Sequence, residues 1–266
     1  NVIDLNRHKS QLEEMVEEQA IKLRESRDVI MDTLSSVIEH RSAETGQHVL
    51  RIRMFTKVLL QDVARCCPEY ELNERSIGVI AEAASLHDIG KISIPDTILN
   101  KPGCLTAEEF EIMKTHTVKG CEILSGLDRM GDEEYLRYAF NICRYHHERW
   151  DGNGYPEGLR GDNTPVYAQA VGIADAFDAL TTDRVYKKAL PPQQALNMIL
   201  NGECGLFSPK LLECLKNVRE QFFNLTFEYA DGYIPKADHA QMSSSVLTPK
   251  TGAENPLELG QMKYFT

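Results

Sequence analysis

Helical periodicity runs through most of the chain and restricts its fold more than any other feature. Between about residues 41 and 228, apolar residues recur every three or four positions, and no segment sustains the apolar–polar alternation of a strand. Loops rich in glycine and proline interrupt this pattern at 92–105 and 148–164. The sequence therefore predicts an all-α bundle whose helices lie within 47–65, 73–86, 106–125, 132–147, 165–180, 191–201 and 209–223.

A long helix is expected ahead of this bundle. Residues 8–40 contain no glycine or proline. An apolar seam with polar positions in it recurs at alternating spacings of four and three, at Leu12, Val16, Gln19, Leu23, Ser26, Ile30, Thr33 and Val37. This heptad pattern is typical of a parallel coiled coil, and it predicts a homodimer formed through the helix. The alternative is an amphipathic helix that packs on its own domain.

The 266 residues suffice for one large domain with appendages. We divide the chain into an N-terminal dimerisation helix (1–36), a helical domain (37–228) and a tail (229–266) that leads towards a further domain. Residues 241–256 are rich in Ser, Thr, Pro, Gly and Asn, as linkers are. Because the chain begins on Asn1 rather than methionine, we expect it to be part of a longer protein.

Charge and apolar content exclude several classes of partner. Asp and Glu number 40 against 29 for Lys and Arg, and the net charge of −11 argues against binding duplex nucleic acid. No apolar stretch approaches the roughly 18 residues of a membrane span. The seven cysteines are scattered and contain no C-x-x-C motif, which favours reduced thiols in the cytoplasm.

Histidines beside acidic residues carry most of the chemical information. His87 and Asp88 follow an apolar segment, and together they can offer nitrogen and oxygen ligands to one cation. Glu44 and His48 are four residues apart, so a helix would present both on one face. A metal site is one interpretation of each pair; a surface pair or a histidine satisfied in the core is the alternative.

Two further segments strengthen the metal interpretation. His146 and His147 end an apolar segment and precede a glycine-rich loop, so they can flank a cluster from two directions. Asp175 and Asp178 lie in an otherwise apolar segment. A buried carboxylate needs a partner, and a metal ion is a common one.

Three motifs in this order resemble the HD-GYP family of HD-domain phosphohydrolases, metal-dependent bacterial phosphodiesterases that open cyclic di-GMP. They are HDIGK at 87–91, HHERWDGNGYP at 146–156 and ADAFDALTTDRVYK at 174–187, and the similarity covers roughly residues 37–225. The resemblance implies an HD-domain helical bundle. Carried over residue by residue, it also implies the metal ligands Glu44, His48, His87, Asp88, His116, His146, His147 and Asp175.

This ligand set implies a particular metal chemistry. Nitrogen and oxygen ligands without a thiolate suit iron or manganese, with zinc or nickel as alternatives. The resemblance implies two divalent ions bridged by Asp88, and a third in members that carry the Glu44 carboxylate. Two cations about 3.5–4 Å apart lower the pKa of a bridging water, so the resulting hydroxide attacks the phosphodiester and no general-base side chain is required.

Other residues are expected to hold the substrate or to support the ligands. Lys91 lies one turn beyond Asp88 and can reach a phosphate oxygen or the nucleophile. In the family, the positions of Arg184 and Lys187 hold substrate phosphates. The Tyr155 ring either contacts the substrate or packs in the core. Two carboxylates are expected to contact ligand side chains without binding metal, Asp151 and Asp178.

The resemblance thus implies a cytoplasmic signalling enzyme, controlled by an upstream receiver or sensor domain, that hydrolyses cyclic di-GMP to linear pGpG and further to GMP in some cases. Two alternatives stay open. One is a phosphohydrolase for another cyclic dinucleotide or a nucleotide. The other is a weakly catalytic module that binds the dinucleotide and signals through partners, which is disfavoured because no family ligand is missing from the sequence.

Overall fold

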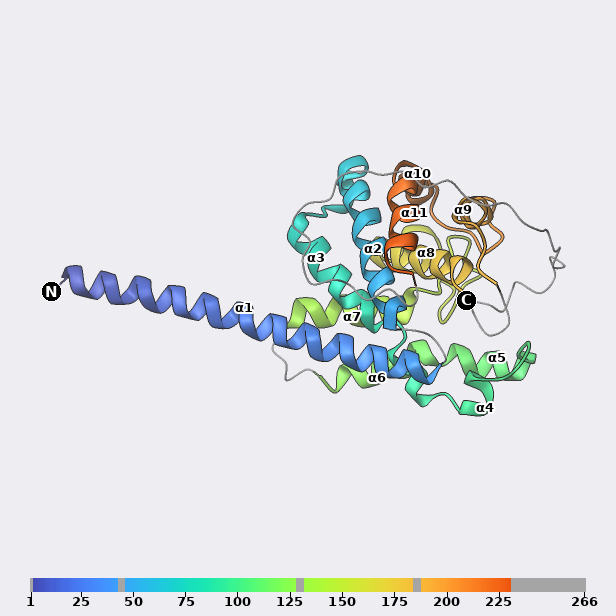
Figure 1. Cartoon of the computed structure of the whole chain (residues 1–266), viewed down its shortest axis with the longest axis horizontal. Helices are drawn as coiled ribbons and strands as arrows, with labels where there is room; N and C mark the ends of the chain where they lie inside the picture. Colours follow the sequence, from blue (N-terminus) through green and yellow to red (C-terminus); the bar gives the residue numbers. More distant parts are fainter. Residues whose placement is uncertain (1, 43–45, 128–131, 184–187, 231–266) are drawn as a thin grey trace.

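The computed structural model describes residues 2–42, 46–127, 132–183 and 188–230, and within these ranges it contains helices and no strand (Figure 1). The prediction of an all-α bundle preceded by a long helix is confirmed. The helices are α1 (Val2–Arg41), α2 (Gly46–Cys66), α3 (Glu74–Ala83), α4 (Asp96–Leu99), α5 (Ala107–Lys114), α6 (His116–Ser125), α7 (Glu133–Tyr145), α8 (Val166–Thr181), α9 (Pro192–Leu200), α10 (Pro209–Asn217) and α11 (Arg219–Glu228). No helix in the described part of the chain has both the length and the apolar character needed to cross a membrane.

Helices α2 and α8 form the centre of the bundle. Helix α2 packs against α1, α3, α8, α10 and α11, and α8 also contacts α7 and α9. The α8 sequence is apolar on every side, and the helix is buried along almost its whole length. Rings from three helices meet here, with Phe55 lying 5.3 Å from Phe177 and 4.6 Å from Phe222 between centroids. The central pair therefore forms a rigid base for any side chains that it carries.

Side-chain caps begin three of the helices, α3, α5 and α7. The Thr106 side chain accepts from the Glu109 N–H, and the Glu109 side chain accepts from the Thr106 N–H, which forms a capping box. The prediction of one helix over 106–125 is wrong, since α5 ends at Lys114 and α6 begins at His116. Between them, the Thr115 hydroxyl donates to the Ile112 carbonyl at 2.6 Å. Such side-chain bonds to the backbone compete with helix continuation.

Helix α1 extends well beyond the bundle at its N-terminal end and packs on it with its C-terminal part, from about Arg27 onward (Figure 1). The packed face carries the buried residues Met31, Ser35 and Ile38. The heptad seam lies on another face, where Ile30 is 58 % and Val37 63 % exposed. The alternative of packing on its own domain therefore holds for the last part of α1, and the domain boundary at residue 36 falls inside this packed part.

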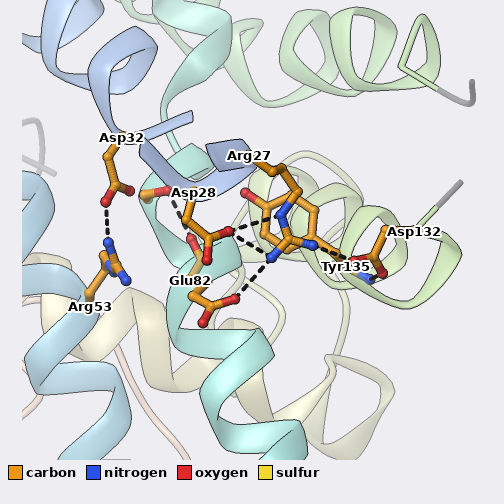
Figure 2. A network of polar contacts seen from close by, with 8 residues as sticks. Arg27, Asp28, Asp32, Arg53, Glu82, Asp132 and Tyr135 are labelled. Carbon is orange, nitrogen blue, oxygen red and sulfur yellow. Dashed lines mark hydrogen bonds and ion pairs between the residues drawn. The ribbon is translucent and has the colours of Figure 1, made fainter. Parts of the chain in front are cut away.

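One arginine joins α1 to two other helices (Figure 2). The Arg27 guanidinium donates to Asp28 at 2.6 Å, to Glu82 of α3 at 3.1 Å and to Asp132, the N-cap of α7. It also lies 4.0 Å from the centroid of the Tyr135 ring, a cation–π distance. We call Arg27 and these four residues the Arg27 network.

The carboxylates around this arginine depend on its charge. Burial raises the pKa of Glu82, and the nearby Asp28 charge raises it further, whereas Arg27 lowers it. Burial alone would lower the pKa of Arg27, but the hydrogen bond and charge of Asp28 raise it. The network thus concentrates negative charge around one cation, and loss of that cation would leave the acids repelling one another.

Replacing Arg27 by alanine should lower the free energy of unfolding. The loss should be roughly 1–3 kcal/mol, below the range for fully buried ion pairs because the carboxylate partners stay partly exposed. Urea denaturation followed by circular dichroism measures it. The matched control is Arg24→Ala, an exposed arginine on the same helix, which should change stability by less than about 0.5 kcal/mol. Equal stabilities for the two variants would contradict this role of Arg27.

Candidate metal centre

Six of the expected metal ligands converge at one end of α2 and α8. His48 lies in the first turn of α2, and His116 is the first residue of α6. The other four lie just beyond helix ends, with His87 and Asp88 between two 3₁₀ turns, η2 (Ala84–Leu86) and η3 (Ile89–Ser93), and His146 and His147 directly after α7. All six are at most 5 % exposed.

The Asp88 carboxylate lies at the centre of these side chains. Its Oδ2 is 3.1 Å from Nε2 of His87, and its Oδ1 is 3.2 Å from Nε2 of His116 and 3.8 Å from Nε2 of His146. The Lys91 ammonium lies 2.7 Å from Oδ2. Asp88 thus faces imidazoles from separate segments of the chain.

Two groups of potential ligands share this carboxylate. The first contains Asp88, His116, His146 and His147, and the second Glu39, His48, His87 and Asp88. Within each group the ligand atoms all lie within 4.8 Å of one another. Asp88 is the residue that the two groups have in common, and each group could hold a divalent cation.

The orientation of the imidazoles fits a divalent cation. The Nδ1 atoms of His87, His116 and His146 each donate to a backbone carbonyl, at 3.0, 2.8 and 2.9 Å respectively. Because a carbonyl only accepts, these bonds place the proton on Nδ1 and leave Nε2 as the lone-pair nitrogen. The three Nε2 atoms and Oδ1 of Asp88 are buried without a hydrogen-bond partner among the described residues. Buried lone pairs of this kind are characteristic of metal ligands.

Asp178 of α8 fixes the orientation of His48. Its Oδ2 accepts from Nδ1 of His48 at 2.7 Å, and the buried Arg51 donates to both of its oxygens. Burial raises the pKa of Asp178, but His48 and Arg51 more than offset this and lower it. Asp178 thus contacts one of the predicted ligands, His48, and its supporting role stays a prediction.

The pKa shifts differ among these residues. Burial lowers the pKa of His116, and it lowers the pKa of His146 and His147 well below the usual range, so these rings stay neutral. Burial would also lower the pKa of His87, but the adjacent Asp88 charge raises it to about 8. Burial alone would raise the pKa of Asp88, but Lys91 and His87 lower it well below its usual range, so the carboxylate is ionised.

Two glycines permit the close backbone contacts that set the ligand spacing. A Cβ atom at Gly90 would lie 1.8 Å from the His116 carbonyl oxygen, and one at Gly172 would lie 2.3 Å from that of His146. Both contacts are with backbone, which cannot rotate away. The segments that carry Asp88, His116 and His146 are therefore held together by packing that tolerates no side chain.

The other expected site residues divide into three sets. Asp175 is buried on α8 and close enough to help raise the pKa of His87, although in the described part it belongs to neither ligand group. The Tyr155 ring stacks on His147 with centroids 4.7 Å apart, and burial raises its pKa. The third set lies outside the described residues: Glu44, Arg184 and Lys187.

The Asp151 carboxylate accepts from the Asn153 backbone N–H at 3.1 Å and from the Asn153 side-chain amide, so it supports the turn of the loop. The Nδ1 of His146 donates to backbone carbonyls. A contact of Asp151 with His147 stays a prediction. An Asp two residues before an Asn-Gly pair is a turn signal, and that was the stronger feature of the local sequence.

Two buried carboxylates were not anticipated from the sequence. Glu148 accepts from the N–H groups of Glu157, Gly158 and Leu159 at 2.8–3.1 Å, which folds the glycine-rich loop back onto the end of α7. Glu39, in the last turn of α1, is 1 % exposed and belongs to the second ligand group. Its helical spacing of four from Ser35 and eight from Met31 was the available signal, but the heptad seam on the other face obscured it.

Comparison with known proteins identifies the family. The model of the HD domain family matches residues 26–210. The chain is 38 % identical over 213 residues to a cyclic di-GMP phosphodiesterase of Vibrio cholerae, covering 79 % of this chain and 43 % of that protein. It is also 38 % identical over 209 residues to a cyclic di-GMP phosphodiesterase of Thermotoga maritima, covering 79 % and 52 % respectively.

Another relative is named for a different cyclic dinucleotide. The chain is 36 % identical over 211 residues to the 3′3′-cGAMP-specific phosphodiesterase 2 of V. cholerae, covering 79 % of this chain and 38 % of that protein. The chain thus spans about half the length, or less, of these relatives.

A solved structure supports the same fold. The crystal structure of a cyclic GMP-AMP-specific phosphodiesterase of V. cholerae superposes with a TM-score of 0.54 at 16 % identity, covering 77 % of this chain and 51 % of that one. At this identity the likeness concerns the fold alone. Together with the HDIGK and HHERWDGNGYP motifs, the family model and the relatives show that the chain belongs to the HD domain family and, within it, to the HD-GYP group.

Proposed function

We propose that this chain is the catalytic part of a phosphodiesterase that hydrolyses a cyclic dinucleotide with two or three divalent cations. The observation that carries the proposal is the Asp88 carboxylate shared by two groups of buried ligands. Bound there, the cations would neutralise phosphate charge and supply an activated water. The relatives named as phosphodiesterases of cyclic di-GMP and of 3′3′-cGAMP support the substrate class.

The residues of the chain have separate tasks in this proposal. Asp88 would be a ligand shared by the two groups, and the rings of His116, His146 and His147 would be the other ligands of one group. Asp178 keeps the His48 ring aligned with the other subsite. Asp175 completes the predicted ligand set from α8. No side chain is assigned as a general base.

Substrate contacts are proposed for four residues. The Lys91 side chain is 15 % exposed and its ammonium lies 2.7 Å from Asp88, so it can contact a phosphate oxygen at the edge of the centre. The stacked ring of Tyr155 forms part of the wall beside His147. Arg184 and Lys187 stay predictions as phosphate contacts, because they lie outside the described residues.

The finer assignments are proposals of the same kind. Cyclic di-GMP is the proposed substrate, with linear pGpG as the product and GMP as a further product. Iron or manganese is the proposed metal, because nitrogen and oxygen ligands suit them, with zinc or nickel as alternatives. We place the enzyme in the cytoplasm, where it acts under an upstream receiver or sensor domain.

A homodimer formed through α1 completes the proposal. The seam residues Val16 and Leu23 are 67 % and 70 % exposed, whereas the face that packs on the bundle lies elsewhere on the helix. A second copy of the helix would cover this seam and extend the signal path from an upstream domain.

Hydrolysis should depend on Asp88. Metal-free protein that is loaded with Mn²⁺ or Fe²⁺ under anaerobic conditions should convert cyclic di-GMP to pGpG. Chromatography of the products measures this conversion. Asp88→Asn should lower the rate by roughly two orders of magnitude or more, because the amide is a poorer ligand for two cations. The control Glu213→Gln, an exposed carboxylate on α10, should keep the wild-type rate.

Other outcomes of this assay select the alternatives. Equal rates for the Asp88→Asn and control variants would contradict the metal mechanism. Hydrolysis of 3′3′-cGAMP without hydrolysis of cyclic di-GMP would select the other substrate. Tight dinucleotide binding by the metal-loaded protein without turnover would favour the binding module.

The dimer has its own test. The double variant Val16→Asp, Leu23→Asp places charge in the seam and should shift the protein from dimer to monomer in analytical ultracentrifugation. Ile21→Asp is the control, since Ile21 is exposed on α1 but lies off the seam, and it should leave the dimer intact. A wild-type monomer, or a double variant that still dimerises, would contradict the coiled coil.

A further inference from the structure

The last turn of α1 brings a carboxylate into the ligand cluster. Glu39 is 1 % exposed, and its ligand oxygen lies within 4.8 Å of the ligand atoms of His48, His87 and Asp88. We propose that Glu39 is a metal ligand of the subsite formed with these three residues, so that the long N-terminal helix is itself part of the metal centre. The inference rests on the proposed function in one respect, that the centre binds divalent cations.

The periodicity of α1 explains why Glu39 points inward. Met31, Ser35 and Ile38 are at most 7 % exposed and form the stripe that packs on the bundle. Glu39 follows Ser35 by four residues and therefore lies on the same stripe. A fully buried Glu on an otherwise packed stripe is rare unless a charged partner or a metal ion accompanies it.

The charges of the second group favour a cation. The Glu39 and Asp88 carboxylates offer ligand oxygens that lie within 4.8 Å of each other, so one divalent ion could accept both. With two imidazoles and two carboxylates, the donor set suits manganese or ferrous iron.

Arg41, two residues beyond Glu39, hydrogen-bonds this end of α1 to the segment that follows Asp88. Its guanidinium donates to the carbonyls of Lys91, Ile92 and Ile94 at 3.2, 2.7 and 2.8 Å. The same group pairs with Asp96 at 2.8 Å. The position of Glu39 relative to the HD pair is therefore set by hydrogen bonds, and a displacement of α1 would move a metal ligand.

Metal binding to metal-free protein tests the inference directly. Manganese titration followed by electron paramagnetic resonance counts bound Mn²⁺ per chain and gives the affinity of each site. Glu39→Gln, which keeps the shape and removes the charge, should lose one bound Mn²⁺ or weaken its binding at least about tenfold. Glu25→Gln, an exposed glutamate on the same helix, is the control and should bind as the wild type does.

A second readout separates a ligand from a structural residue. The melting temperature of Glu39→Gln is measured with and without Mn²⁺. The rise in melting temperature on adding Mn²⁺ should be smaller than in the wild type. Glu39→Asp, which keeps the charge but shortens its reach, should fold and bind Mn²⁺ more weakly, and it serves if the glutamine variant does not fold.

The outcomes distinguish this inference from the proposed function. If the wild type binds Mn²⁺ and both Glu39 variants bind it equally well, the ligand role of Glu39 is wrong while the metal centre stands. A lower melting temperature of metal-free Glu39→Gln with unchanged Mn²⁺ binding would likewise overturn it. A wild type that binds no divalent ion would overturn both proposals. Glu44→Gln, measured in parallel, shows whether the carboxylate expected from the family contributes a separate site.

Discussion

The buried carboxylate of Asp88 is the group on which the rest of the centre depends. An ionised carboxylate surrounded by buried imidazoles is stable only when positive charge compensates it. In the described residues that charge comes from Lys91, whose ammonium lies 2.7 Å from the carboxylate. Divalent cations on either side of Asp88 would supply far more. The lone pairs directed at the centre, rather than any single motif, support a metal-binding role.

The helical bundle holds the predicted ligand side chains close to Asp88. The buried rings of His87, His116 and His146 are each fixed by a backbone carbonyl, and that of His48 by Asp178, so these rings have little rotational freedom to lose on metal binding. The contacts at Gly90 and Gly172 let the backbones carrying the ligands approach. Helix α1 is joined to the bundle through two arginines. Arg27 donates to Glu82 of α3, and Arg41 donates to the carbonyl of Ile94 in the segment after Asp88. The proposed signalling helix and the proposed catalytic centre are therefore parts of one packed unit.

How much of this was predictable depends on the range of the interaction. The helices, the Thr106 capping box and the HD and HH pairs follow from local spacing, and the family resemblance added His116. The break at Thr115 turns on one side-chain hydrogen bond. The Arg27 network joins residues up to 105 positions apart, which no local pattern records. Glu39 was missed because α1 carries two apolar stripes, and the sequence alone does not say which one faces the bundle.

A crystal structure of the manganese-loaded protein, with anomalous scattering recorded near the manganese absorption edge, tests the central claim most directly. The account predicts at least two anomalous peaks about 3.5–4 Å apart, one on each side of the Asp88 carboxylate. One of them should have the imidazoles of His116, His146 and His147 as neighbours. A single peak remote from Asp88, or no peak in a protein that turns over its substrate, would contradict the account.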